Sequence, residues 1–323
     1  MFNVLTIGDS TIDTYLVIDD AEIECDLHKK NCRLCFNYAD KIPIKTTAQS
    51  VGGNAANVAV GVRKLGLKTA IVTELGDDIN GHVVKHELGR VGVDTSLVKL
   101  LKNRETRYSV VLNYQSERTI LSYYAKRRYS LPNLPKTQWI YYTSLGQSFE
   151  NLQAKLALYL KRNPDTKLAL SPGSYQMKHG LATIEKLIPR AQLIIVNKEE
   201  AEQLTGKLGP EKTLAGMLQK QGAEIIVITD GEHGSFASDG SQSYCMQVYP
   251  IPPVSKTGAG DAYASGFLSA IIYGKTLPEA MRWGTANAGG VIQEWGAQHG
   301  LLTRPQLLRT LSRHSSILPV RKS

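Results

Sequence analysis

Residues 254–263 read VSKTGAGDAY, in which the small residues Gly258, Ala259 and Gly260 stand directly before the carboxylate of Asp261. The apolar residues that follow predict a helix beginning near Ala259. The first turn of a helix has unpaired backbone N–H groups and the positive end of the helix dipole, so this turn is expected to bind an anion. A carboxylate beside a bound anion is unfavourable unless it removes a proton from an attacking group, as phosphoryl transfer requires. An ordinary glycine-rich turn fits the same residues, so other motifs have to decide.

The chain of 323 residues predicts one α/β domain with a doubly wound, mostly parallel sheet flanked by helices. Short apolar runs, typical of parallel strands covered on both faces, alternate with segments of helical periodicity. The expected strands are Val4–Ile7, Thr69–Glu74, Trp139–Ser144, Lys167–Leu170, Leu193–Val196 and Glu224–Ile228. The expected helices are about Asn54–Leu65, His82–Val91, Phe149–Arg162, Glu211–Gln221, Ala259–Tyr273 and Pro278–Glu294.

Two segments interrupt this alternation. Residues 13–47 contain a cysteine-rich insertion, and residues 104–124 alternate polar and apolar side chains around a polar turn. Alternation with period two is typical of an exposed antiparallel hairpin. Both segments are therefore expected to leave the main sheet and form one small β lid.

Further motifs precede or follow the expected elements. Two glycines stand before a helix rich in small residues. Polar residues follow two of the expected strands, at the carboxyl ends where ligands of doubly wound sheets bind. These motif residues are Gly52, Gly53 and Asn57 in VGGNAAN, Asn197 and Glu200 in VNKEEAE, and Thr229, Gly231 and Gly234 in ITDGEHGS.

On these motifs the chain resembles the ribokinase-like (PfkB) carbohydrate kinases over almost its whole length. Gly52, Gly53 and Asn57 resemble the N-terminal family signature, and residues 257–261 resemble the C-terminal one. The resemblance implies that Asp13 binds sugar hydroxyls, together with the N-terminal signature. It also implies that Asp261 is the catalytic base, with the amides of Gly258, Ala259, Gly260 and Asp261 as the anion hole.

The same resemblance implies a nucleotide side that uses ATP and Mg²⁺. Asn197 and Glu200 match a family motif that organises magnesium and phosphate through water. The residues expected at nucleotide phosphates are Thr229, Gly231 and Gly234, and Asn287 lies on the helix that borders the adenine pocket. Family lids often pair across a dimer, which implies a homodimer through the lid.

The chain departs from the family pattern before the C-terminal signature. Members commonly carry Asp-Thr there, and in many of them this Asp is part of a monovalent-cation site. Ser255 and Lys256 occupy these positions in this chain. The resemblance therefore does not extend to a requirement for a monovalent cation.

The residues of the lid hairpin indicate which classes of substrate are possible. Arg107 follows Thr106 where members that take plain sugars often have Gly, and arginine binds phosphate or carboxylate through two parallel donors. A phosphosugar or sugar acid is thus an alternative to a neutral sugar. Aromatic residues at Tyr108, Tyr123 and Tyr124 leave a nucleoside as a third alternative, although tyrosines of a hairpin also pack its face.

Charge and hydropathy limit the partners. The net charge is +9, but Lys and Arg are spread along the chain with short clusters at Lys126–Arg128 and Arg321–Lys322. A nucleic-acid-binding arm would concentrate them, so the charge favours attraction for anionic small molecules. No stretch approaches the roughly 18 apolar residues of a membrane span, and residues 1–10 do not resemble a signal peptide. A cytoplasmic location is expected.

The insertion contains an unusual cluster of potential ligands. Cys25, His28, Cys32 and Cys35 read C-x2-H-x3-C-x2-C, and these side chains can bind zinc. This spacing is more compressed than in most structural zinc sites, so reduced thiols in a small lid element are the alternative. Without a secretory signal, a disulfide framework is not expected.

Two other functions fit parts of the sequence. Ser10 in IGDSTID resembles the nucleophile block of SGNH-type hydrolases, and Asp230 with His233 would complete a triad in the correct chain order. No G-x-N-D block accompanies them. A sugar- or nucleotide-sensing module on a kinase scaffold is the second alternative, although Asp261 is the residue that such a module would normally have lost.

Overall fold

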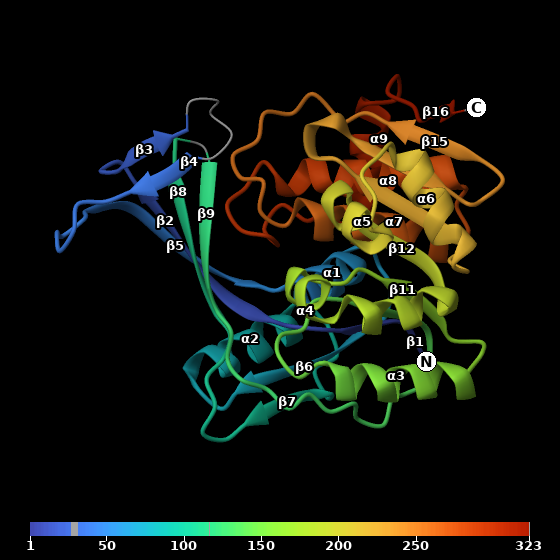
Figure 1. Ribbon diagram of the computed structural model, residues 1–323, viewed down its shortest axis with the longest axis horizontal. Helices are drawn as coiled ribbons and strands as arrows, with labels where there is room; N and C mark the ends of the chain where they lie inside the picture. Colours follow the sequence, from blue (N-terminus) through green and yellow to red (C-terminus); the bar gives the residue numbers. More distant parts are fainter. Residues whose placement is uncertain (27–31, 116, 323) are drawn as a thin grey trace.

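The computed structural model describes residues 1–26, 32–115 and 117–322, and its centre is a ten-stranded sheet (Figure 1). The strand order is β16-β15-β14-β13-β12-β11-β10-β1-β6-β7. The strands from β13 to β7 in this order pair in parallel, whereas β14, β15 and β16 are antiparallel to their neighbours. Their bounds are Phe2–Ile7 (β1), Thr69–Gly76 (β6), Val98–Leu101 (β7), Thr137–Tyr142 (β10), Lys167–Leu170 (β11), Ala191–Asn197 (β12), Ile225–Thr229 (β13), Ser235–Ser238 (β14), Ser243–Met246 (β15) and Val320–Lys322 (β16).

Helices cover both faces of this sheet, which confirms the doubly wound fold. The side chains of α3, α4, α5 and α6 join one apolar core, and those of α1, α7, α8 and α9 join a second. A third cluster connects α1 and α2 with the root of the lid. The helices are Asn54–Lys64 (α1), Ile79–Arg90 (α2), Glu150–Arg162 (α3), Ser174–Ile184 (α4), Lys198–Thr205 (α5), Glu211–Lys220 (α6), Ala259–Ile272 (α7), Leu277–Val291 (α8) and Arg304–Arg313 (α9), with short 3₁₀ turns at Glu185–Arg190 (η1) and Gly231–His233 (η2).

Strand β1 shows why the central strands read as continuous apolar runs. Leu5 and Ile7 belong to the first core, and Val4, on the opposite face, belongs to the second. Successive side chains of a strand point to opposite faces, so a strand buried between two helix layers is apolar at most positions.

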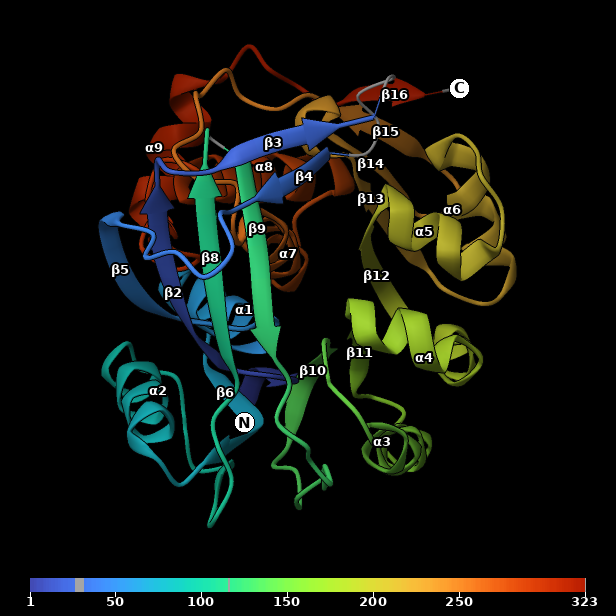
Figure 2. The same cartoon turned by 60° about the vertical axis from the view of Figure 1, so that its left-hand side comes forward.

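The two segments that interrupt the alternation form a separate lid, as expected. Its four-stranded sheet has the order β5-β2-β8-β9, and a two-stranded hairpin, β3-β4, adjoins it (Figure 2). In Figure 1 this lid extends to the left, away from the main sheet. The strands are Thr11–Ile18 (β2), Glu22–Cys25 (β3), Cys32–Cys35 (β4), Ile44–Gly52 (β5), Tyr108–Tyr114 (β8) and Glu117–Tyr123 (β9).

The chain reverses its direction of strand addition between β1 and β10. After β1 it adds β6 and β7 on one side, and it then returns to add β10, β11, β12 and β13 on the other. Ligands of such sheets bind outside the carboxyl ends of the strands at this switch point. The first lid strand, β2, begins four residues after β1 ends, so the lid is anchored there.

No helix within the part of the chain that the structure describes combines the length and the apolar character needed to cross a lipid bilayer.

Candidate active site

The tip of helix α7 presents free backbone donors. Gly258 is the N-cap with a φ of 81°, and a Cβ there would lie 2.5 Å from the Cβ of Ala297, so this position requires glycine. Among the described residues the amides of Gly258, Gly260 and Asp261 have no hydrogen-bond acceptor, whereas the Ala259 amide makes a long 3.5 Å contact. This turn therefore retains donors for an anion.

Asp261 projects from the same turn and is held by a hydrogen-bond chain. Asn57 in α1 donates from Nδ2 to Oδ2 of Asp261 at 2.8 Å. Gln298 donates from Nε2 to Oδ1 of Asn57 at 2.9 Å. Because the Asn57 amide is bonded at both its nitrogen and its oxygen, residues from three distant parts of the chain determine the orientation of the carboxylate.

The environment of Asp261 raises its pKa to about 7. Burial is the main cause, because it penalises the charged carboxylate; Glu200 and Asp13 add smaller contributions, and the hydrogen bond from Asn57 opposes them. A carboxylate with a pKa near neutral is suited to accept a proton at physiological pH.

Asp13 lies in lid strand β2, next to the glycine pair. Thr11 donates from Oγ1 to Oδ1 of Asp13 at 2.8 Å, and burial raises the pKa of Asp13. A Cβ on Gly52 would lie 2.0 Å from Oδ2 of Asp13, so the absence of a side chain at this position makes room for the carboxylate. Gly53 has a φ of 89°, and a Cβ there would lie 2.6 Å from the carbonyl oxygen of Asp9 and 2.7 Å from Cα of Ser10.

Arg107 is already paired in the structure. Its guanidinium forms an ion pair with Asp9, which follows β1, and lies 3.9 Å from the ring centre of Tyr124. Tyr129 donates to the other carboxylate oxygen of Asp9 at 2.8 Å. The side chains of Arg107 and Asp9 are only 13% and 5% exposed, so a substrate anion would meet an arginine that already has a carboxylate partner.

The expected nucleotide motifs lie at the ends of β12 and β13. Asn197 and Glu200 form a capping box at the start of α5, with bonds of 2.8 and 3.0 Å between each backbone amide and the other side chain. Burial, with a smaller contribution from Glu199, raises the pKa of Glu200 to about 6. Glu200 also contributes to the raised pKa of Asp261, so the two carboxylates share one electrostatic environment.

The turn after β13 requires its two glycines. Gly231 and Gly234 have φ values of 51° and 92°, in the region that favours glycine. At Gly234 a Cβ would also lie 2.1 Å from the carbonyl oxygen of Met246. Thr229 pairs with Ser235 across this turn, and Asn197 pairs with Thr229 between the parallel strands, so the two nucleotide motifs are neighbours.

Asn287, which the family resemblance places on the helix that borders the adenine pocket, uses its side chain in hydrogen bonds within the protein. Asn287 is fully buried in α8, where Nδ2 donates to the carbonyl of Ala262 and to Oγ of Ser265, both at 2.9 Å. Its Oδ1 accepts from the amide of Leu302 at 2.9 Å. The side chain thus joins α8 to α7 and to the following loop, which positions the helix that carries Asp261.

The carboxylates fit a magnesium ion held mainly by phosphate oxygens. Mg²⁺ in phosphoryl-transfer sites is usually bound by one or two carboxylates together with substrate phosphates. Glu200 uses Oε2 in its capping bond, and its other oxygen makes no hydrogen bond with the described residues. The described residues contain no group of three or more His, Cys, Asp or Glu side chains that could hold a metal ion by themselves.

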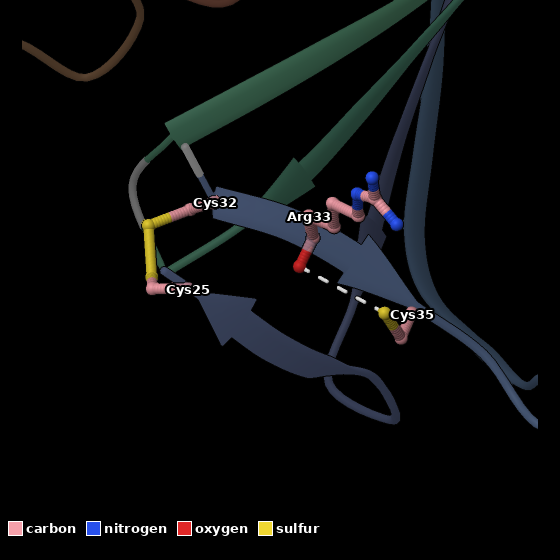
Figure 3. The surroundings of a disulfide bond; sticks show 4 residues. All are labelled: Cys25, Cys32, Arg33 and Cys35. Atoms are coloured by element: carbon pink, nitrogen blue, oxygen red, sulfur yellow. Dashed lines mark hydrogen bonds between the residues drawn. A yellow bond between two sulfur atoms is a disulfide. The ribbon is translucent and has the colours of Figure 1, made fainter. Parts of the chain in front are cut away.

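The cysteine cluster does not form the expected zinc site. Cys25 and Cys32 are joined by a disulfide between the paired strands β3 and β4 (Figure 3). A sulfur in a disulfide is not a thiolate ligand, so neither residue binds zinc in this state. Cys35 is free, and His28 lies outside the described residues. The alternative expectation of reduced thiols is also wrong for this pair, because the hairpin brings two residues seven positions apart into register.

The hydrolase alternative is excluded by distance. Ser10 follows β1 and Asp230 follows β13, and β10, β11 and β12 lie between these strands. Four strand spacings correspond to roughly 19 Å, which is far beyond hydrogen-bonding reach. The carboxylate of Asp230 lies 3.6 Å from the ammonium of Lys198. The residues therefore do not form a triad.

Comparison with known proteins agrees with this geometry. The sequence profile of the pfkB family carbohydrate kinases matches residues 13–304, which include the lid, the glycine pair and the helix that carries Asp261. The chain belongs to this family. Members of the pfkB family are carbohydrate kinases, which are phosphotransferases.

Several curated relatives of this pfkB family kinase span most of its length. An ATP-dependent 6-phosphofructokinase of Thermoanaerobacterium thermosaccharolyticum is 25% identical over 92% of this chain and 89% of its own. A 5-dehydro-2-deoxygluconokinase of Shouchella clausii is 29% identical over 80% and 85%. A ribokinase of Haemophilus influenzae is 26% identical over 80% and 87%.

Solved structures show the same fold. The structure of Arabidopsis thaliana ribokinase complexed with ribose and ATP matches with a TM-score of 0.77 and 21% identity, covering 96% of this chain and 98% of that one. A nucleoside kinase of Methanocaldococcus jannaschii matches with a TM-score of 0.79 and 19% identity, covering 97% and 99%.

Several residues at the site had not been assigned a role from the sequence. Asp9 forms an ion pair with Arg107 and accepts a hydrogen bond from Tyr129. Gln298 donates a hydrogen bond to Asn57. Gln298 lies in an irregular loop after α8, where no periodic pattern marks a residue as important. Asp9 was adjacent to a glycine after the first strand, which is the one signal that could have drawn attention to it.

Proposed function

We propose that this pfkB family kinase transfers the γ-phosphoryl group of ATP to a hydroxymethyl group of a sugar or sugar derivative. The observation that carries the proposal is the carboxylate of Asp261, held by Asn57 next to free amides at the tip of α7. A base beside backbone amides that are free to donate to an anion is the arrangement that phosphoryl transfer to an alcohol requires.

In the proposed reaction Asp261 accepts the proton of the acceptor hydroxyl while that oxygen forms a bond to the γ-phosphorus. The bond from this phosphorus to the bridging oxygen breaks, and ADP retains the electron pair. The amides of Gly258, Gly260 and Asp261 donate to the oxygens of the transferring group. When bound, Mg²⁺ neutralises phosphate charge, and Glu200 is the side chain proposed to hold it through water.

The acceptor is proposed to bind between the glycine pair and the lid. Asp13 has one carboxylate oxygen bonded to Thr11, and Asn57 lies beside the base, so both side chains can orient sugar hydroxyls. The nucleotide is proposed to bind at Asn197, Thr229, Gly231 and Gly234. Asn287 is proposed to position α7, because both ends of its side-chain amide are bonded within the protein.

A neutral sugar is favoured over a phosphosugar or sugar acid. Asp9 compensates the charge of Arg107, and a second anion would have to compete with this buried carboxylate. The presence of a ribokinase among the relatives supports a neutral sugar, whereas the presence of a 6-phosphofructokinase leaves a phosphosugar as an alternative. A nucleoside kinase among the structures of the same fold keeps the third alternative.

A homodimer through the lid is part of the proposal. Strand β9 exposes Leu121 by 56% and Tyr123 by 49% on the same face of the lid sheet, and such side chains are favourable contacts for a second copy. Light scattering should give the mass of a dimer, and Leu121→Glu should shift it towards the monomer. A monomeric wild-type protein would contradict this part.

The experiment that tests the function is a screen of ADP release over neutral sugars, sugar acids, phosphosugars and nucleosides. One class should support turnover, and Asp261→Asn should lower kcat for it by about 10²–10⁴-fold while ATP binding persists. Asp165→Asn, on an exposed loop, is the matched control. Near-normal turnover by Asp261→Asn would refute the assigned base, and ATP binding without turnover on any acceptor would favour a sensor.

A further inference from the structure

A basic pocket of about 410 Å³ lies outside the candidate active site, at the base of the lid hairpin β8-β9. Its walls come from the end of β6, from β7 and the following loop, from the segment after β9, and from the loop after β10. Its cationic lining residues are Lys99, Lys102, Arg104, Lys126, Arg127 and Arg128. This volume is within the range of small-molecule sites.

The charge of this basic pocket is poorly compensated by protein groups. Its one acidic lining residue, Glu74, receives hydrogen bonds at Oε1 from the amide and hydroxyl of Ser130 and lies 3.6 Å from the ammonium of Lys99. Over residues 1–26, 32–115 and 117–322, no ion pair is formed by Lys102, Arg104, Lys126, Arg127 or Arg128. Five like charges gathered around one cavity repel each other unless an anion lies between them.

Arg127 is the strongest indication of a missing anion. It is only 6% exposed, and its guanidinium donates to the backbone carbonyls of Glu105 and Lys126. The carboxylates of Asp9 and Asp78 attract it, but no carboxylate in the described part of the chain lies within ion-pair distance of it. A buried charge without an ionic partner is costly, and buried charges in proteins are normally paired. An anion bound in the basic pocket would supply this partner.

The backbone at two points of the basic pocket is held in an uncommon conformation. Ser148, in the wall, has a φ of 69°, and Asn103, between two of the cationic residues, has a φ of 56°. Positive φ values are rare for residues other than glycine, and they concentrate at binding sites.

The basic pocket is distinct from the acceptor site. Its lining includes neither Asp13, Asn57 nor Asp261. Residues 125–129 lie between the two. Lys126, Arg127 and Arg128 line the basic pocket, whereas Ala125 and Tyr129 are buried and do not line it. On the side of the active site, Tyr129 contacts Asp9.

We propose that the basic pocket binds a small multivalent anion, of phosphate or polyphosphate chemistry, that acts on the lid. One wall of the basic pocket comes from the segment before β8, which begins at Tyr108. Another comes from the segment after β9, which ends at Tyr123. An anion in contact with both walls connects the start of strand β8 with the end of strand β9. It therefore changes how readily the lid closes over the acceptor, without being a substrate itself.

The test is calorimetric titration of the full chain with inorganic pyrophosphate in metal-free buffer. A saturating non-hydrolysable ATP analogue is present, so that the amides of α7 are occupied. The charge-reversal variant Lys102→Glu/Arg128→Glu should weaken pyrophosphate binding at least tenfold, because it replaces two charge-assisted contacts by repulsion. The control Lys136→Glu/Lys186→Glu makes the same change of net charge at exposed positions elsewhere and should alter affinity less than twofold.

Pyrophosphate should also change KM for the acceptor found in the screen, and this effect should disappear in Lys102→Glu/Arg128→Glu. No binding by the wild type at millimolar pyrophosphate, equal losses in both double variants, or displacement by the ATP analogue would each overturn the site. An unchanged KM would overturn its action on the lid. Because the titration does not depend on turnover, failure of the kinase proposal alone would leave the binding result readable.

Discussion

The side-chain amide of Asn57 donates a 2.8 Å hydrogen bond to the carboxylate of Asp261, although 204 positions separate these residues in the chain. The contact joins the glycine pair before α1 to the helix tip that carries the candidate base. It also lowers the pKa of Asp261 against the larger effect of burial. This pair therefore determines both where the base points and the pH at which it can accept a proton.

Activity should depend on the ionisation of Asp261. We expect kcat/KM to fall about tenfold per pH unit below about pH 7, because the protonated carboxyl cannot accept the acceptor proton. Asn57→Ala removes a bond that lowers this pKa, so the acidic limb should move to higher pH. Gln298→Ala leaves the bond in place and should move the limb less. Identical limbs for the wild type and Asn57→Ala would contradict the role of this bond.

Ionisation of Asp261 should lower the stability of the folded protein, although it is required for activity. The pKa of Asp261 is about 7 in the folded protein and 3.8 for the ordinary side chain, so the folded state binds more protons between these values. Stability is therefore lost as pH rises through this window. Asp261→Asn should raise the free energy of unfolding by on the order of 2 kcal/mol at pH 8 and by almost nothing at pH 4. Urea titrations at both pH values measure this, and an equal effect at the two would refute it.

Gly52→Ala should impair acceptor binding. The added Cβ would lie 2.0 Å from Oδ2 of Asp13, so the carboxylate has to move. We expect KM for the acceptor to rise at least tenfold, with ATP affinity unchanged. Gly216→Ala, in helix α6 with no neighbouring atom within 4 Å of the added Cβ, is the matched control and should bind the acceptor normally. A normal KM for Gly52→Ala would separate Asp13 from acceptor binding.

The pairing of Arg107 with Asp9 makes a prediction that differs from recognition of a substrate anion. Arg107→Ala leaves a buried carboxylate without its cation and should destabilise the protein by about 3–5 kcal/mol. Asp9→Asn in the same chain should recover part of this loss. If Arg107 instead reads a substrate anion, Arg107→Ala should raise KM for a phosphorylated sugar far more than for its neutral analogue. Kinetics with both sugars, measured beside chemical denaturation, decide between the two roles.

The lid disulfide predicts a thiol count. Cys35 and Cys245 are free, and Cys25 is bonded to Cys32. Protein purified without reductant and then denatured should give two reactive thiols per chain, and reduction should raise this to four. Four thiols before reduction would show that the pair is not formed, and about one zinc per chain by elemental analysis would then restore the metal hypothesis.

Local patterns were sufficient for much of the fold. The strands expected from apolar runs all form with ends within two residues, because a strand between two helix layers must be apolar on both sides. Helices α4 and α9 and strands β7, β14, β15 and β16 were not expected. The α9 segment RPQLLRTLSR is mostly polar, and these strands have three or four residues, which is too short for a periodic pattern to be evident.

For the candidate site, the residues at the tip of α7 could be identified from the chain alone, because a run of small residues, an acid and an apolar helix are consecutive. The partners of these residues depend on how distant elements pack together. Asn57 and Asp261, Arg107 and Asp9, Asn287 and Leu302, and the cations of the basic pocket come together through packing of separate elements. A local pattern reports the burial of its own segment, whereas hydrogen bonds, ion pairs and pKa values depend on whichever distant group the fold places within a few ångströms.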